Sequence, residues 1–393
     1  MTSKTPYITT LTPLRGIAAL LVVIFHSSLF LMPLVPQGST SFISNGWMWV
    51  DFFFVLSGFI LSYVYGKNFQ GTVKGAAFKK YVGSRFARVY PLHLFTLLWA
   101  LAATICIVRL SDGLDPFFAV IFNPKAFPST LVLLQGMNLY ITPPLNTPSW
   151  SLSTEWWVYM IFPFLVPVFS RLKIVGKVVA FAAITALFFS LMYLLGPIAQ
   201  PFHTGQPHMN LVADYGFLRC LAGFLLGMLL LEIYQAKTGY RLFKQSWTFV
   251  VLFAGVVAAM HFGIHDLIII GSFPLIILAA AYNDSSIKKL LDTRPLQRLG
   301  DWSFSIYMVH IPIVFTYYVY VVSENPKHFS DIMALMNQKP DYLTGWIMCG
   351  LWVAASLVVA SLTYRFIEVP ARNALNKRFA TKTRKVVPES VEV

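Results

Sequence analysis

The chain has 393 residues, of which 57% are hydrophobic and only 12% are charged. Soluble globular domains average about 25% charged residues, so this composition leaves too few charges for an ordinary water-exposed surface. Apolar runs of about 20 residues recur along the whole chain, which predicts a polytopic membrane protein. The composition excludes a soluble enzyme with a single anchor, a nucleic-acid-binding domain and a disordered chain. The unbroken apolar runs also exclude a transmembrane β-barrel, whose strands alternate.

Ten apolar segments predict membrane-spanning helices, and together they predict an all-α bundle. In chain order they cover residues 12–34, 46–65, 90–110, 150–169, 174–195, 211–234, 247–263, 266–283, 302–322 and 345–367. The first run is too long for the apolar region of a signal peptide, so we expect it to be a retained span. Residues 111–149 contain six prolines and only short apolar runs, which indicates an outer loop with short or re-entrant helices packed on the bundle.

The distribution of basic residues predicts the orientation of this bundle. If the N-terminus is inside, 25 of the 30 Lys and Arg residues fall in inner segments, four fall in outer segments, and Arg219 lies within a span. Such a bias predicts that both termini are cytoplasmic, and it accounts for the net charge of +14 without a nucleic-acid partner. We therefore expect one membrane domain over residues 1–375, followed by a basic, disordered cytoplasmic tail over residues 376–393.

Metal and disulfide chemistry is not expected from this sequence. The three cysteines, Cys106, Cys220 and Cys349, lie in apolar stretches without a CxxC motif or a His/Cys cluster. This pattern predicts neither a disulfide framework nor a metal site.

Ionisable residues inside a span are costly to insert, so those that remain are candidates for function. Arg15 and His26 share the first span, eleven residues apart. That spacing is about three helical turns, which places both on one face with a separation of about 16 Å. Arg15 near the inner boundary could also be an arginine that only sets orientation, and His26 near the centre could be a satisfied core residue. Their common face favours a functional role for both.

Two carboxylates lie near the outer ends of their spans. Asp51 opens the second span, where a helix N-terminus favours an acid, and Glu155 lies about one turn into the fourth. Ser151 or Ser153 could cap the fourth helix, with Glu155 completing a capping box. In the alternative reading, Asp51, Glu155 and His26 converge in one cavity. A neutral histidine held by a carboxylate is a suitable general base for a hydroxyl group.

Two further polar groups lie within spans. Arg219 could form an internal pair with an aspartate such as Asp214, which would hold helices together, or it could form an anion site. His310 lies seven residues after Ser303 and shares its helix face, so a structural and a functional role stay open. Ser57 lies deeper than Asp51 in the second span, and the adjacent Gly58 permits close helix contact.

Residues 73–90 are basic and contain interleaved aromatic residues, which predicts an interfacial amphipathic helix before the third span. Anchoring to anionic lipid would explain this composition. Arg85 and Arg88 are also spaced three apart on one face, so they could clamp phosphate groups from the cytoplasm.

Together these motifs resemble the acyltransferase family three of membrane proteins. The matching pieces occur in the family's order and span residues 11 to about 375. They are Arg15 with His26, residues 51–58, 85–91 and 150–155, Arg219 with Phe224 and Gly227, residues 300–310, and residues 367–370.

This resemblance implies a membrane O-acyltransferase in the bacterial inner (cytoplasmic) membrane. Such proteins move an acyl group, most often acetyl, from cytoplasmic acyl-CoA to a sugar hydroxyl of a cell-surface or exported polysaccharide or glycolipid. Acyl-CoA, most commonly acetyl-CoA, would be the donor, and no metal is implied. We expect His26, as general base or acyl carrier, to act with Asp51 and Glu155. We expect the donor to bind at Arg15, Arg85, Arg88 and Arg219, and substrate-contacting or structural roles to fall to Ser57, Trp150, Ser151, Tyr307 and His310.

A proton-coupled transporter or flippase is the main alternative, because buried His, Arg and carboxylate groups also form proton relays. Against it, the sequence contains no visible inverted repeat and no matched pair of broken helices. A non-catalytic scaffold would leave the face shared by Arg15 and His26 unexplained.

Overall fold

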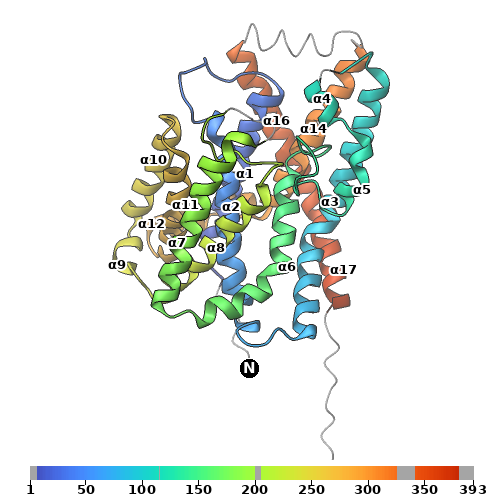
Figure 1. The fold of residues 1–393 in the computed structure, drawn as a ribbon. Helices are drawn as coiled ribbons and strands as arrows, with labels where there is room; N and C mark the ends of the chain where they lie inside the picture. The colour runs from blue at the N-terminus through green and yellow to red at the C-terminus, as the bar shows by residue number, and fades with distance from the viewer. Residues whose placement is uncertain (1–6, 115, 200–204, 325–340, 380–393) are drawn as a thin grey trace, which may run out of the picture.

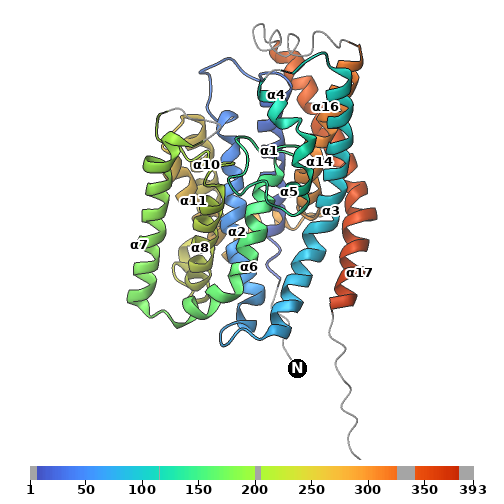
Figure 2. The ribbon, with the colours of Figure 1, turned by 45° about the vertical axis from the view of Figure 1, so that its right-hand side comes forward.

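The protein is described by a computed structural model that covers residues 7–114, 116–199, 205–324 and 341–379. Within these ranges the regular structure consists of helices, with no strand. The long helices stand side by side in an upright bundle, as the two ribbon views show (Figures 1 and 2). The predicted all-α membrane bundle is therefore confirmed.

The long apolar helices follow the predicted spans in chain order. Eight are long and apolar enough to cross a membrane, and two shorter apolar helices, α10 and α11, occupy the seventh and eighth predicted segments. The helices are α1 (Leu11–Phe30), α2 (Trp49–Tyr65), α3 (Gly75–Leu110), α6 (Ser149–Arg171), α7 (Ile174–Ser190), α8 (Gly216–Gln235), α10 (Ser246–His261), α11 (Asp266–Tyr282), α14 (Ser303–Glu324) and α16 (Tyr342–Thr363).

Shorter helices connect these elements or extend them. They are α4 (Pro116–Ile121), α5 (Phe127–Leu131), α9 (Tyr240–Phe243), α12 (Ser286–Leu291), α13 (Arg294–Asp301) and α17 (Val369–Phe379). A π-helical turn, η6 (Tyr364–Glu368), joins α16 to α17, so the last span continues as one helical rod to Phe379. The predicted tail begins inside α17, and its remainder, residues 380–393, lies outside the described residues.

The interfacial helix expected before the third span is not a separate element. Residues 75–110 form one continuous helix of 36 residues, α3, although Pro91 lies inside it. The reason is that the first half of α3 also has a buried side, where Tyr81 packs edge-on against Phe69 and contacts Phe162. At 1.5 Å per residue α3 is about 54 Å long, well beyond a hydrocarbon core of about 30 Å.

The proline-rich connection between α3 and α6 contains short helices, as predicted, and it also enters the core. The Leu133 carbonyl accepts hydrogen bonds from Ser153 Oγ at 2.6 Å and Trp157 Nε1 at 2.9 Å. Asn146 Nδ2 donates to the Met308 carbonyl on α14 at 2.9 Å. The connection therefore fixes α6 and α14 relative to each other.

Glycines bring α2 and α8 into close contact. A Cβ atom at Gly227 would collide with the Val55 carbonyl oxygen, and one at Gly58 would collide with the Phe224 carbonyl oxygen. The expectation that Gly58 allows a close helix approach is confirmed. Such small-residue contacts are typical of membrane helix pairs, which have no hydrophobic driving force between them.

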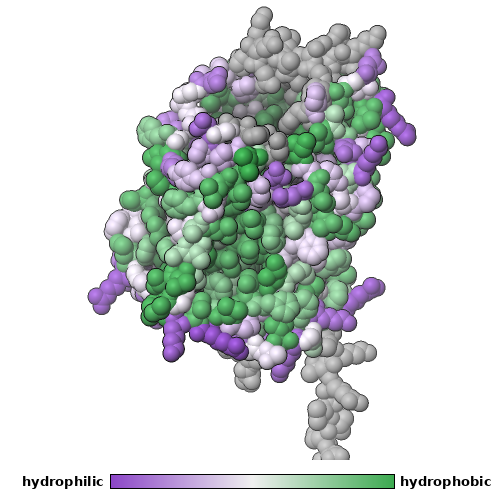
Figure 3. Space-filling model, viewed as in Figure 1, coloured by the Kyte–Doolittle hydropathy of each residue, from purple (hydrophilic) through white to green (hydrophobic). Residues whose placement is uncertain are grey.

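The two ends of the described chain lie at the same end of the bundle. Tyr7, Arg15, Arg88 and Arg372 line one cavity there, so the start of α1 meets α3 and α17. The Phe379 ring packs on Gly83 nearby. We call this the basic end. In Figure 3 an apolar surface forms a broad band, and hydrophilic groups gather below it.

Candidate active site

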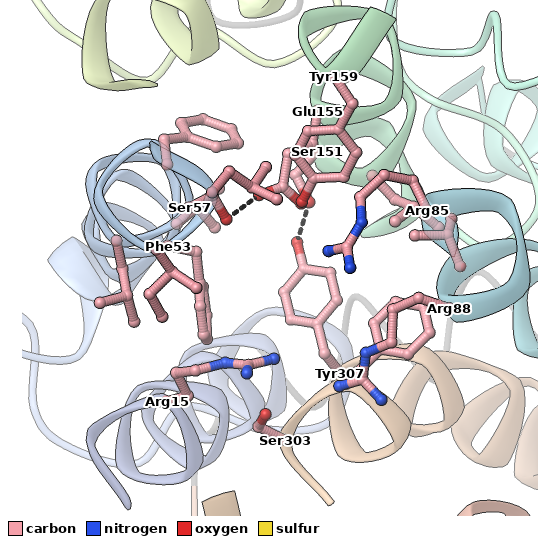
Figure 4. Close-up of a pocket in the computed structure, with 18 residues that line it drawn as sticks. Arg15, Phe53, Ser57, Arg85, Arg88, Ser151, Glu155, Tyr159, Ser303 and Tyr307 are labelled. Carbon is pink, nitrogen blue, oxygen red and sulfur yellow. Dashed lines mark hydrogen bonds between the residues drawn. The ribbon is translucent and has the colours of Figure 1, made fainter. Parts of the chain in front are cut away.

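A cavity of about 150 Å³ lies at the centre of the bundle, between α1, α2, α3, α6 and α14 (Figure 4). We call it the central cavity. Its walls combine apolar side chains with the ionisable groups that the sequence singled out. The polar and charged lining residues are Arg15, Ser57, Arg85, Arg88, Ser151, Glu155, Tyr159, Ser303 and Tyr307.

Glu155 reaches the central cavity from the second turn of α6. Ser57 Oγ on α2 donates a hydrogen bond to Glu155 Oε1. The capping-box alternative does not hold, because α6 begins at Ser149 without a side-chain cap and Ser153 bonds the Leu133 carbonyl instead. The carboxylate is therefore free of any capping role and links α6 to α2 across the cavity.

Tyr307 on α14 forms one wall of the cavity. Its hydroxyl lies 2.7 Å from Ser151 Oγ and 3.0 Å from the Pro148 carbonyl oxygen. Phe53 packs edge-on against the Tyr307 ring. These contacts hold the ring in one orientation between α2 and α6.

Three arginines lie around the same cavity, and each has a different environment. Arg85 Nη2 donates to the Tyr65 hydroxyl at 2.9 Å, while its buried Nε has no hydrogen-bond partner among the described residues. Arg88 pairs with Glu368, which is 1% exposed. No hydrogen bond or ion pair in the described part of the chain involves Arg15, whose guanidinium extends into the cavity from α1 (Figure 4).

Glu368 lies within residues 367–370, one of the matching pieces of the sequence, and no role was predicted for it. Besides its ion pair with Arg88, it accepts a hydrogen bond of 2.9 Å from Ser305 Oγ and lies 3.5 Å from Arg372 Nη1. The sequence indicated this residue only as a carboxylate between an apolar span and a basic segment. Its partner on α3, 280 positions earlier in the chain, could not be read from local spacing.

A wider cavity of about 380 Å³ adjoins the central one at the basic end. The two share Arg15, Arg85 and Arg88 as lining residues. This mouth cavity adds Tyr7, Thr12, Arg372 and Asn376 to its walls, among others. Four arginines against one acidic lining residue, Asp301, make it a strongly cationic site. Guanidinium groups bind phosphate oxygens in bidentate geometry, so this chemistry suits a phosphorylated ligand.

A third cavity, of about 80 Å³, adjoins the central one on the other side and contains His26. We call it the histidine cavity. Val50 and Tyr307 line both, so the Tyr307 side chain lies between them. Trp150 lines the histidine cavity together with Thr142, Asn210 and apolar neighbours. The three cavities thus follow one another from the basic end to His26.

His26 is held by another histidine and not by a carboxylate. His310 Nε2 lies 3.1 Å from His26 Nδ1, and the His310 carbonyl accepts a hydrogen bond of 2.7 Å from Trp352 Nε1. The expected convergence of His26 with Asp51 and Glu155 is wrong. Glu155 lies in the central cavity, and the Asp51 side chain is engaged by Arg219.

Asp51 and Arg219 form a bidentate ion pair between α2 and α8. Arg219 Nε lies 2.8 Å from Asp51 Oδ1, and Nη2 lies 2.6 Å from Oδ2. Arg219 Nη1 donates to the Leu211 carbonyl at 3.0 Å, and the guanidinium lies between the Trp47 and Trp150 rings. Of the two roles left open for Arg219, the structure supports the internal ion pair that holds helices together, with Asp51 as the partner. Because Arg219 is 0% exposed, the geometry does not fit the expected donor-binding role.

The described residues contain no group of three His, Cys, Asp or Glu side chains that could hold a metal ion. The three cavities bring together two histidines, the carboxylates of Glu155 and Asp301, hydroxyl groups and arginines. The site can accept a proton at His26 and can bind anionic groups at the basic end.

Comparison with known proteins gives matches over most of the chain. The model of a family described as an acyltransferase domain matches residues 10–365. The O-acetyltransferase OatA of Staphylococcus aureus is 24% identical over 96% of this chain, and the alignment covers 59% of that relative's length. The acyltransferase MdmB of Streptomyces mycarofaciens is 26% identical over 77% of this chain and 78% of its own.

A third relative, protein 2 in the picA locus of Rhizobium radiobacter, is 32% identical over 36% of this chain and 73% of its own length. No solved structure matches. The family model covers far more than half of the sequence, including the helices that line the central and histidine cavities. The chain therefore belongs to the acyltransferase family three, a family of membrane acyltransferases.

Proposed function

We propose that this membrane acyltransferase moves an acetyl group from acetyl-CoA to a sugar hydroxyl of a cell-surface or exported polysaccharide or glycolipid. The donor would come from the cytoplasm and the enzyme would reside in the inner membrane. The observation that carries the proposal is the row of three cavities from a cationic mouth to the pair of His26 and His310. One relative is an O-acetyltransferase, which supports acetyl as the group and oxygen as the acceptor atom.

The mouth cavity is suited to the nucleotide end of the donor. CoA carries phosphate groups, and Arg15, Arg85 and Arg372 present guanidinium groups to that cavity. Arg15 is the group best placed to bind them, because it has no internal partner among the described residues. The extended arm of CoA would then enter the central cavity past Ser57 and Glu155.

The distance between the phosphates and the reacting carbon fits this path. Arg15 and His26 lie on one helix, eleven residues apart, which corresponds to about 16 Å of rise. A thioester on an arm of similar length would reach Tyr307 and the histidine cavity. Displacement of the Tyr307 side chain would be required, since it separates the two cavities.

The proposed chemistry is a proton transfer coupled to acyl transfer. The acceptor hydroxyl gives its proton to His26 Nε2 while its oxygen bonds to the thioester carbon. The carbon–sulfur bond then breaks, and the departing CoA thiolate takes a proton from His26, so that protons balance. His310 positions the ring through its contact with Nδ1. An acyl-His26 intermediate would use the same residues in two steps.

Asp51 and Arg219 would act on this reaction only by fixing α2 against α8. Glu155 and Ser57 would line the path of the arm, and Trp150 and Ser151 would shape the boundary near Tyr307. The catalytic contribution is thus assigned first to His26.

The test is transfer of radiolabelled acetyl from acetyl-CoA by the purified protein, with wild type beside His26→Ala. A general base contributes about 10²–10⁴-fold, so His26→Ala should lose transfer by at least two orders of magnitude. His93→Ala is the control, because His93 is a histidine inside a span that lines none of the three cavities. Near-normal transfer by His26→Ala would rule out the assigned base.

A second measurement separates an acyltransferase from a transporter. CoA should raise the thermal midpoint of the purified wild-type protein, and the same shift should appear with His26→Ala, whose mouth cavity is intact. A transporter that uses these buried groups for proton movement would show no stabilisation by CoA. That result, together with absent transfer, would refute the proposed donor.

A further inference from the structure

A large apolar cavity lies away from the proposed active site. It is a crevice of about 520 Å³ between α7, α8 and α11, and it shares no lining residue with the central, mouth or histidine cavities. Its lining is almost wholly apolar and includes Phe181, Phe188, Leu229, Ile270 and Leu278. We call it the α7 crevice.

The crevice opens toward the surface that faces hydrocarbon in a membrane. Phe181 and Phe189 on α7 are 55% and 51% exposed, and both line it. Helix α7 stands at the outer side of the bundle in Figure 2 and packs against α8. An apolar cavity open to the bilayer is not filled by water, because the hydrocarbon core contains none. A lipid chain is the available occupant.

The length of the crevice corresponds to one leaflet. Its lining on α11 runs from Leu267 to Leu278, which at 1.5 Å per residue is about 16 Å. Half of a hydrocarbon core of about 30 Å is about 15 Å. One acyl chain, anchored at its headgroup, would therefore fill the groove from end to end.

Basic residues flank the end of the crevice that lies beside α9. Thr238, Gly239 and Phe243 line that end. Lys237, Arg241 and Lys244 belong to the same short segment, and Lys237 and Arg241 are exposed. The nearest carboxylate on α8, Glu232, is already paired with Lys177 of α7 at 2.7 Å, so it does not neutralise these charges. A basic cluster at the membrane surface attracts anionic headgroups.

We propose that the α7 crevice binds one acyl chain of an anionic phospholipid, whose phosphate group contacts Lys237, Arg241 and Lys244. The occupant is a lipid of the leaflet at the basic end. This site is independent of the acyl-transfer site, and its occupancy holds α7 against α11 through the lipid chain.

A steric variant tests the apolar part of the site. Gly271 lines the crevice, and a Cβ atom there would meet nothing within 4 Å. Gly271→Leu should therefore fill the groove without disturbing the backbone. Gly255→Leu on α10 is the matched control, because Gly255 is equally unobstructed but does not line the crevice. Full-length protein in nonionic detergent would be titrated with phosphatidylglycerol or phosphatidylcholine, and bound lipid would be counted by native mass spectrometry.

A charge variant tests the headgroup. Lys237→Ala/Arg241→Ala/Lys244→Ala should weaken phosphatidylglycerol binding by about tenfold or more and should leave phosphatidylcholine binding unchanged. The control removes three other exposed basic residues, as Lys67→Ala/Lys289→Ala/Arg294→Ala.

The expected result is one retained phosphatidylglycerol per protein, lost in Gly271→Leu and weakened in the triple variant but not in either control. Equal retention in Gly271→Leu and Gly255→Leu would overturn the crevice as the site. Equal retention of phosphatidylglycerol and phosphatidylcholine by the wild type would overturn the headgroup assignment. Neither outcome depends on acetyl transfer, so the two proposals fail separately.

Discussion

Two groups of buried charges lie in this bundle, and they are organised in opposite ways. Asp51 and Arg219 satisfy each other completely, with two hydrogen bonds between them and two tryptophan rings beside the guanidinium. Around the central cavity, by contrast, Arg15 has no partner and Arg85 has an unbonded Nε among the described residues. The first group is closed to any ligand, whereas the second has unused donors next to a cavity.

The comparison shows that a charged residue in a membrane span does not by itself indicate a functional site. A buried pair costs desolvation energy that its own contacts must offset. Such a pair fixes the relative position of two helices without a ligand. An arginine without an internal partner keeps its hydrogen-bonding capacity for a substrate. The residue type is the same in both groups, and the difference lies in what surrounds it.

The largest expected effect on stability comes from breaking the Asp51–Arg219 pair. Arg219→Ala or Asp51→Ala leaves one buried charge uncompensated and should lower the free energy of unfolding by about 3–5 kcal/mol. The measurement is the thermal midpoint and monodisperse yield in detergent.

A double variant separates this pair from a binding role. Asp51→Leu/Arg219→Met removes both charges and should recover most of the stability lost in the single variants. If the single variants are as stable as wild type, the pair does not hold α2 on α8.

A smaller effect is expected at Glu368, which joins α14 and the η6 turn to Arg88. Glu368→Gln keeps the shape but weakens the charge-assisted contact to Arg88, which is 19% exposed and so can be partly hydrated. We expect a loss of about 1.5–3 kcal/mol in unfolding free energy. Ser305→Ala, measured in the same thermal assay, removes only the neutral donor and should cost less. An equal loss for the two variants would contradict this ranking.

The Arg15→Ala variant should lower the affinity for CoA and leave stability nearly unchanged, whereas Arg219→Ala should lower stability. Stability should change little, because Arg15 makes no hydrogen bond or ion pair with the described residues. The apparent affinity for CoA should fall by about tenfold or more, since a charge-assisted hydrogen bond to phosphate is worth about 1.5–3 kcal/mol. Isothermal titration with CoA at low and high salt would measure it, and unaltered affinity would exclude Arg15 from the donor site.

The smallest effect is expected at an exposed pair outside the membrane spans. Lys288 Nζ lies 2.5 Å from Asp292 Oδ2. Partial desolvation raises the pKa of Asp292, but the contact with Lys288 outweighs it and the pKa lies below its ordinary value. The pair therefore stabilises the fold above the ordinary aspartate pKa and loses that contribution as pH falls through the lowered value. Asp292→Asn should lower the free energy of unfolding by less than about 1 kcal/mol at pH 7. A larger decrease in that free energy would show that the pair is not screened by solvent.

Much of the fold could be predicted because membrane helices are encoded locally. Apolar length and the position of Gly58 correctly indicated the spans and a close helix contact. The long helix α3 was missed because its first half combines Lys79 and Lys80 with buried Tyr81, and composition alone suggested a surface helix. Local charge did not indicate where the helix begins and ends.

The site was less predictable, for a physical reason. Periodicity tells which face of a helix a residue occupies, but not which helix meets that face. The pairing of His26 with His310 spans 284 positions, and that of Asp51 with Arg219 spans 168. Arg15 and Glu155 were each singled out for their cost in a membrane, and they line one cavity, although the sequence did not predict that they would share it. Their neighbours depended on how the helices pack around the core.

The side chain of Tyr307 has a consequence for the cell as well as for the reaction. An enzyme whose cavities approach both faces of a membrane risks becoming a leak for protons, and each charge crossing 100 mV dissipates about 2.3 kcal/mol. Tyr307, held by Ser151 and the Pro148 carbonyl, separates the mouth side from the histidine cavity. In the proposed reaction an incoming acyl group must pass this ring, and the same ring would close the resting protein to ion flow between the two cavities.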